Sequence, residues 1–221
     1  MNHTSGNIEM LVRVDYLQFI RKIFLICILA LGYLFPTISA AAEISGRVTI
    51  HGLSHNADEV VYLAPLKNVT YEPPDTLPVM DQIYHAFEPR VMPVVVGTTV
   101  KFRNSDMTTH SVFTPNSTGD HFDLGTWMGK NIVKKQTFDK RGAVTLLCEI
   151  HSGMKGFIFV TPSPYFDKTN LDGKFTISGV PDGEYLIQAW AEQGESESRK
   201  IEVQNGGITD IQLSISVEEY Y

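Results

Sequence analysis

Three side chains that bind soft metal ions lie close together in one short segment of the sequence. Cys148, His151 and Met154 are each separated by two residues, and a further imidazole lies upstream at His110. Thiolate, imidazole and a weak thioether form the donor set that selects copper and lets the ion exist in two oxidation states. The sequence therefore predicts one copper ion at His110, Cys148, His151 and Met154.

Two predicted strands position the three clustered donors. Residues 143–147, a mostly apolar run, precede Cys148, and a second apolar run, residues 156–160, follows Met154. Each run has the length and composition of a buried strand. The three donors are therefore expected on a short loop that joins two strands, and His110 on another loop, which follows a predicted strand over residues 99–103.

Short stretches of apolar or alternating residues recur along the rest of the chain. Seventeen glycines and eleven prolines separate these stretches, which favours an all-β chain with many turns. Pro93 interrupts one stretch and predicts that this strand lies at a sheet edge or carries a bulge. The further predicted strands cover residues 44–50, 60–63, 91–96, 111–113, 122–124, 134–138, 174–177, 184–190, 201–203 and 211–217.

The N-terminal segment has the organisation of a secretory signal. Arg21 and Lys22 precede an apolar run over residues 23–35, and small residues follow at 39–42. We predict a signal peptide over residues 1–42 and a periplasmic or secreted bacterial protein without a stable membrane span, an uncleaved anchor being the alternative. Removal of the segment also removes Cys27, so that Cys148 is the one thiol left. A metal ligand would account for a lone exported cysteine.

The charge of the chain excludes one class of partner. The formal net charge is -7 and no basic block interrupts the sequence. Binding to nucleic acid is therefore not expected.

Residues 80–161 resemble a cupredoxin, a small blue copper protein of the plastocyanin and amicyanin family. The resemblance lies in residues 95–104, in His110-Ser111-Val112 and in the loop of residues 148–154, which has the short spacing of amicyanin. It implies a Greek-key β-sandwich and a type 1 copper site. His110, Cys148 and His151 would form the trigonal plane, and Met154 would be the weak axial ligand.

Two residues beside the ligands call for separate predictions. Ser111 stands where many cupredoxins have an asparagine whose side chain ties the two ligand loops together. Because outer contacts orient metal ligands, the serine predicts a looser site or a shifted reduction potential. Glu149 is expected to be a solvated carboxylate, and a tuning residue or an oxygen ligand is the alternative.

The flanking residues resemble a second small β-sandwich, the regulatory-like module of carboxypeptidases. Residues 44–63 and 169–190 carry the resemblance, the latter with the turns at Asp172-Gly173 and Asp182-Gly183. We assign residues 44–71 to the first part of the module and residues 165–217 to the second. The copper domain, residues 80–161, would then be inserted between the two parts. An alternative assigns residues 44–63 to the copper domain. The two resemblances together cover most of residues 44–190, and they imply a likeness to bacterial proteins that are often labelled methylamine-utilisation proteins.

These observations predict an exported type 1 copper protein that carries one electron at a time. Its partners would be redox proteins of the periplasm or cell surface. Four protein donors leave no open position for a substrate, so an enzyme is not expected. Two alternatives remain, a copper-binding or delivery protein without an electron-transfer role, and a structural binding module with a vestigial metal site.

Overall fold

The structure is a computed structural model that describes residues 42–52, 57–115, 121–204 and 206–216. The predicted signal peptide lies outside these residues except for Ala42. Strands dominate the described residues, so the predicted all-β class is confirmed. No helix in this part of the chain is long and apolar enough to cross a membrane.

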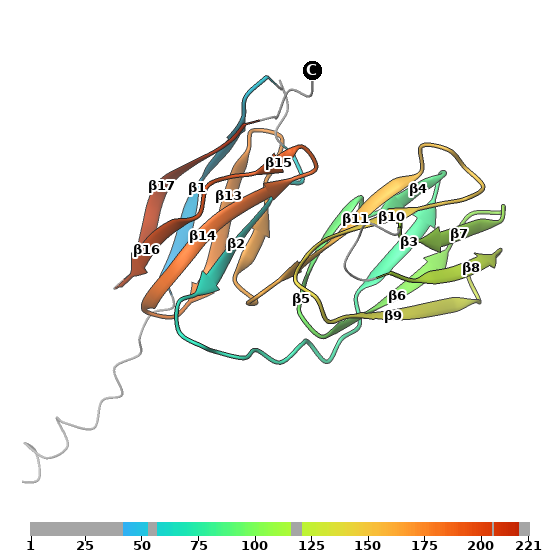
Figure 1. Cartoon of the computed structure of the whole chain (residues 1–221), viewed down its shortest axis with the longest axis horizontal. Coiled ribbons are helices and arrows are strands. Elements are labelled where there is room, and N and C mark those ends of the chain that lie inside the picture. Colours follow the sequence, from blue (N-terminus) through green and yellow to red (C-terminus); the bar gives the residue numbers. More distant parts are fainter. Residues whose placement is uncertain (1–41, 53–56, 116–120, 205, 217–221) are drawn as a thin grey trace, which may run out of the picture. The chain divides into compact units, whose positions relative to one another are not determined.

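Nine consecutive strands form one β-sandwich (Figure 1). One sheet has the strand order β4-β3-β6-β9 and the other has the order β5-β11-β10-β7-β8. The strands are β3 (Val79–Ile83), β4 (Ala86–Glu88), β5 (Val91–Val95), β6 (Thr98–Asn104), β7 (His110–Phe113), β8 (Asp123–Trp127), β9 (Val133–Phe138), β10 (Gly142–Leu147) and β11 (Lys155–Thr161).

Alternating side chains fill the space between these two sheets. Val100 and Phe102 of β6 and Ile158 and Val160 of β11 are buried in one apolar cluster. Successive residues of a strand point to opposite faces, so the residues between them face away from this core. β5 lies at the edge of its sheet, as Pro93 predicts, because proline has no N–H to donate to a second neighbour.

A second β-sandwich is built from residues at both ends of the described chain. Its sheets have the orders β13-β1-β17 and β12-β2-β14-β15, and β16 pairs with β14. A single apolar core lies between them. The strands are β1 (Ala42–Ile50), β2 (Val60–Pro65), β12 (Phe166–Lys168), β13 (Lys174–Val180), β14 (Gly183–Ala191), β15 (Gly194–Glu195), β16 (Arg199–Val203) and β17 (Gly207–Ile215).

The first two strands of the chain join this second sandwich through long-range pairing. β1 pairs antiparallel with β13 and parallel with β17, and β2 pairs with β12 and β14. The register of β1 against β17 shifts at Gly46. A Cβ atom there would lie 2.0 Å from the carbonyl oxygen of Ile211, so only glycine allows this approach of the two backbones.

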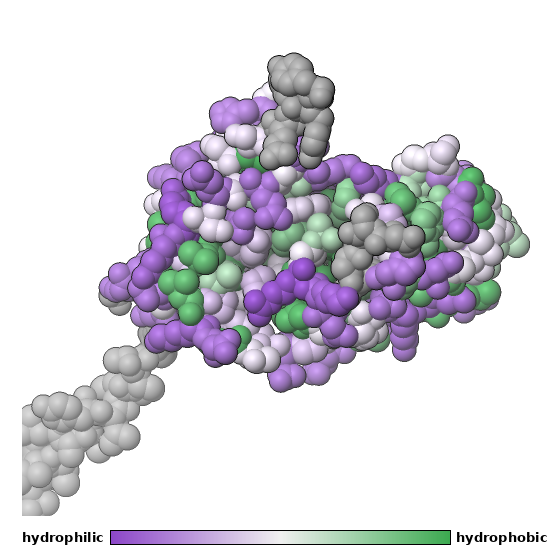
Figure 2. Space-filling model, viewed as in Figure 1, coloured by the Kyte–Doolittle hydropathy of each residue, from purple (hydrophilic) through white to green (hydrophobic). Residues whose placement is uncertain are grey.

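A third apolar cluster contains residues of both sandwiches. Phe157 and Phe159 of β11 pack with Trp190 of β14, and the ring centroids of Phe159 and Trp190 are 4.9 Å apart. The carboxylate of Glu192 accepts hydrogen bonds from Arg90 and Lys155 beside this cluster. Elsewhere, the visible face in Figure 2 is largely hydrophilic, with apolar residues in small groups.

We expect residues 79–161 to fold without the rest of the chain, because both sheets of the first sandwich and their core lie inside this range. The fragment should show a cooperative denaturant transition by circular dichroism. Phe157 and Phe159 would lose their apolar neighbours, so the fragment should also bind a hydrophobic dye.

The matched control is a fragment of residues 42–66, which should be unfolded because the partners of β1 and β2 are missing. A fragment 79–161 that becomes ordered only when residues 42–66 are attached would contradict the predicted domain division.

Candidate metal centre

The ends of three strands bring the predicted metal ligands to one end of the first sandwich. His110 is the first residue of β7, Cys148 directly follows β10, and Met154 directly precedes β11. The loop between β10 and β11 is closed by a hydrogen bond from the backbone N–H of Met154 to the carbonyl oxygen of His151, 3.1 Å long. Gly153 adopts a φ of 92°, a left-handed conformation that favours glycine and lets the loop turn this sharply.

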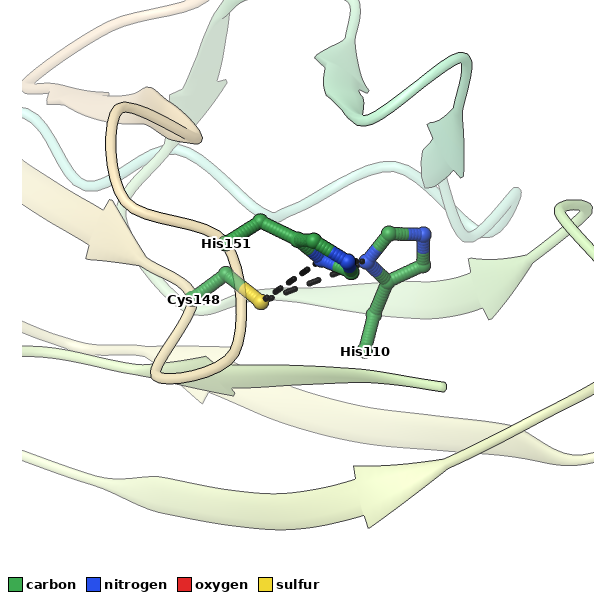
Figure 3. Close-up of side chains that lie close together, drawn as sticks. All are labelled: His110, Cys148 and His151. Atoms are coloured by element: carbon green, nitrogen blue, oxygen red, sulfur yellow. Dashed lines mark hydrogen bonds between the residues drawn. The ribbon is translucent and has the colours of Figure 1, made fainter. Parts of the chain in front are cut away.

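Three of the four predicted donors converge (Figure 3). The Sγ atom of Cys148 lies 4.0 Å from Nδ1 of His110 and 3.9 Å from Nδ1 of His151. The two Nδ1 atoms are 3.0 Å apart. His110 is fully buried and Cys148 is 8% exposed, whereas His151 is half-buried and is the most exposed of the three.

The fourth predicted donor, Met154, is buried in the same apolar cluster as Cys148. Its backbone is held beside His151 by the hydrogen bond that closes the loop. Its place as the axial ligand stays a prediction.

The surroundings of Cys148 favour the thiolate. Burial raises the pKa of this thiol, but hydrogen bonds from the backbone N–H groups of Ser111, His151 and Ile150 outweigh burial, and the net pKa is lowered. A lowered thiol pKa increases the share of thiolate, the form of cysteine that binds metal ions.

The surroundings of His151 favour the neutral imidazole. Loss of hydration lowers the pKa of this ring, and the neighbouring imidazoles of His110 and His85 lower it further. A neutral ring keeps a lone pair for a metal ion. One thiolate sulfur and two imidazole nitrogens, converging in a buried position, fit a copper ion by their chemistry.

Ser111 connects the two ligand-bearing segments through hydrogen bonds. Its hydroxyl accepts a hydrogen bond of 2.8 Å from the backbone N–H of Glu149 and contacts Sγ of Cys148 at 3.8 Å. Its own N–H also donates to that sulfur, at 3.5 Å. Serine is short, but the loops approach closely enough for its hydroxyl to replace the expected amide. Glu149 itself is exposed, as predicted for a solvated carboxylate.

Two residues that the sequence did not single out as part of the site lie against the ligands. The ring of His85 stands edge-on to His151, with centroids 4.6 Å apart, and lies 5.6 Å from the ring of His110. The carboxylate of Asp106 lies 2.8 Å from Nε2 of His110. Asp106 and His110 are four residues apart in the sequence, and this spacing is a signal that could have indicated the contact.

Comparison with known proteins finds structural similarity to copper proteins. No protein-family model and no curated protein sequence matches this chain. A copper-containing nitrite reductase from Thermus scotoductus is 25% identical over 44% of this chain and 25% of its own, with a TM-score of 0.37. A purple cupredoxin from Nitrosopumilus maritimus is 19% identical over 39% of this chain and 99% of its own, with a TM-score of 0.34. The reduced state of an amicyanin mutant is 23% identical over 45% of this chain and 98% of its own, with a TM-score of 0.36.

Replacement of Ser111 by alanine should loosen the site. The change removes the acceptor for the N–H of Glu149 and the hydroxyl beside Cys148. We expect the free energy of unfolding to fall by about 1–2 kcal/mol, the contribution of one or two hydrogen bonds. Urea denaturation measures this loss, and Ser152→Ala, at an exposed position of the same loop, is the control. Equal stabilities of the two variants would contradict a tie through Ser111.

Replacement of Met154 by leucine tests the predicted axial ligand. Leucine keeps the buried volume but removes the sulfur, a weak donor that stabilises oxidised copper more than reduced copper. We therefore expect retained copper binding and a higher reduction potential by voltammetry. The matched control is Met92→Leu, which also lies in the apolar core but on β5. A potential that moves equally in both variants would exclude Met154 as axial ligand.

Proposed function

We propose that this chain is an exported copper protein that carries one electron at a time between redox proteins. The observation that carries the proposal is the convergence of Sγ of Cys148 with the Nδ1 atoms of His110 and His151. Met154 would complete the donor set. Copper in such a site supplies one-electron redox chemistry, and thiolate, imidazole and a weak axial thioether suit an electron-transfer site.

The attachment of the ligands supports electron transfer. His110 is fixed at the start of a strand, and the loop of Cys148 and His151 is closed by its own hydrogen bond and by Ser111. A site held in this way changes little in geometry between two oxidation states, so little reorganisation would oppose electron transfer.

The surroundings of His151 support contact with a partner protein. The side chain of His151 is the most exposed of the three converging ligands. Ile150, which precedes His151 in the sequence, is 46% exposed. Tyr84, next to His85, is 87% exposed, and Met107, next to Asp106, is 96% exposed. Exposed apolar groups of this kind fit a redox partner that docks briefly around His151.

Export belongs to the same proposal. The signal-like sequence of residues 1–42 supports export to the periplasm or to the outside of the cell. After removal of this segment, Cys148 would be the single thiol of the exported protein. For the second sandwich we propose a regulatory-like module that assists binding. A carrier, rather than an enzyme, is proposed because four protein donors would leave no position for a substrate.

A visible absorption spectrum of the mature protein with copper tests the proposal. We expect an intense thiolate-to-copper band that disappears on reduction and returns on oxidation, and that is absent from Cys148→Ser. A band without a reversible couple, with copper lost readily to a chelator, would favour a delivery protein. No stable copper binding would contradict the metal site and favour a structural module.

A further inference from the structure

Asp106 connects a predicted metal ligand to a neighbouring hairpin. Its Oδ2 atom lies 2.8 Å from Nε2 of His110 and accepts the backbone N–H of His85 at 3.0 Å. Its Oδ1 atom accepts the backbone N–H of Tyr84 at 2.8 Å. The backbone N–H of Asp106 donates to Oδ1 of Asn104, which holds the loop that carries the carboxylate.

These contacts determine which nitrogen of His110 carries the proton. An ionised carboxylate can only accept hydrogen bonds, and Asp106 already accepts two backbone N–H groups. Nε2 of His110 must therefore be the protonated nitrogen, as donor to Asp106. The lone pair of the neutral ring is then on Nδ1, which faces Cys148 and His151 (Figure 3).

The pair is shielded from water. The side chain of His110 has no exposed surface and that of Asp106 is 13% exposed. A charge-assisted hydrogen bond in such a place is stronger than one at the surface. The negative charge of the carboxylate beside the ring would also stabilise the higher charge of oxidised copper more than that of reduced copper.

We propose that Asp106 is a positioning residue that fixes the Nε2–H tautomer of His110 and lowers the reduction potential of the bound copper. This inference rests on the proposed function. The reduction potential determines which redox partners the copper site can reduce, so Asp106 would help to determine those partners.

The same carboxylate holds His85 against the ligands. Tyr84 and His85 have φ values of 55° and 58°, a left-handed conformation that is unfavourable for residues other than glycine. Two hydrogen bonds to Asp106 offset this cost. The turn directs the ring of His85 onto His151, so Asp106 also organises the outer covering of the site.

The first test compares the reduction potentials of the copper-loaded wild-type chain and Asp106→Asn. The amide has one acceptor oxygen for three N–H donors and lacks the charge. Loss of an outer partner of a metal-bound histidine lowers metal affinity by roughly 10–100-fold. If the loss of affinity affects oxidised copper and not reduced copper, the reduction potential rises. At about 59 mV for each tenfold change in a one-electron couple, the expected rise is about 60–120 mV.

The control is Glu149→Gln, which removes one negative charge directly beside Cys148 in sequence, at an exposed position. The change in reduction potential in this variant measures the effect of losing a nearby negative charge without losing a hydrogen bond to a ligand. A shift in Asp106→Asn that exceeds the control supports the hydrogen bond as the cause. Equal shifts overturn the proposal.

The second test needs no copper and no variant. Long-range ¹H–¹⁵N spectra of the metal-free wild-type chain report the tautomer of each histidine. We expect His110 to carry its proton on Nε2, with slow exchange against solvent. A proton on Nδ1 overturns the proposal even if Asp106→Asn fails to fold. A wild-type chain with the Nε2–H tautomer but no thiolate-to-copper band would instead contradict the proposed function.

Discussion

Mutual repulsion of the donor atoms is the constraint on which the site depends. Two imidazole nitrogens lie 3.0 Å apart, and a thiol with a lowered pKa lies about one ångström further from each. Lone pairs brought together in this way repel one another unless a proton or a metal cation lies between them. Other residues of the protein must therefore supply the free energy that holds the donor atoms close together.

Several layers of structure supply that free energy. The sheet β5-β11-β10-β7-β8 contains the strands that lead to all four predicted ligands. Ser111 connects the two ligand-bearing segments, and Asp106 connects His110 to the β3–β4 hairpin of the other sheet. β11 has a double role, because Ile158 faces the core of its own sandwich while Phe159 packs against Trp190 of the other. The two faces of β11 thus pack against two different apolar cores.

Sequence patterns predict the parts of this arrangement that depend on local chemistry. Alternation and turn residues indicate most strands, and Pro93 indicates an edge. The β3–β4 hairpin escapes such patterns, because its left-handed turn is formed by Tyr84 and His85, where glycine or asparagine would be the usual signal. Donor types and spacing indicate Cys148, His151 and His110. The contacts of His85 and Asp106 depend on the register of β3 against β6, which the sequence does not reveal. The contact of the Ser111 hydroxyl with the N–H of Glu149 depends on the distance between the two loops, which the sequence does not reveal either.

The long-range pairing of β1 has a consequence for folding. Its two neighbours, β13 and β17, follow only after the complete first sandwich has been synthesised. A chain that is synthesised from its N-terminus can therefore complete the first sandwich while β1 and β2 still lack their partners. Strands with open edges are prone to pair with other chains, and closing such distant contacts is slow. The risk of aggregation during folding is thus concentrated in the second sandwich. It persists until β17, the last described strand, has been synthesised and has paired with β1.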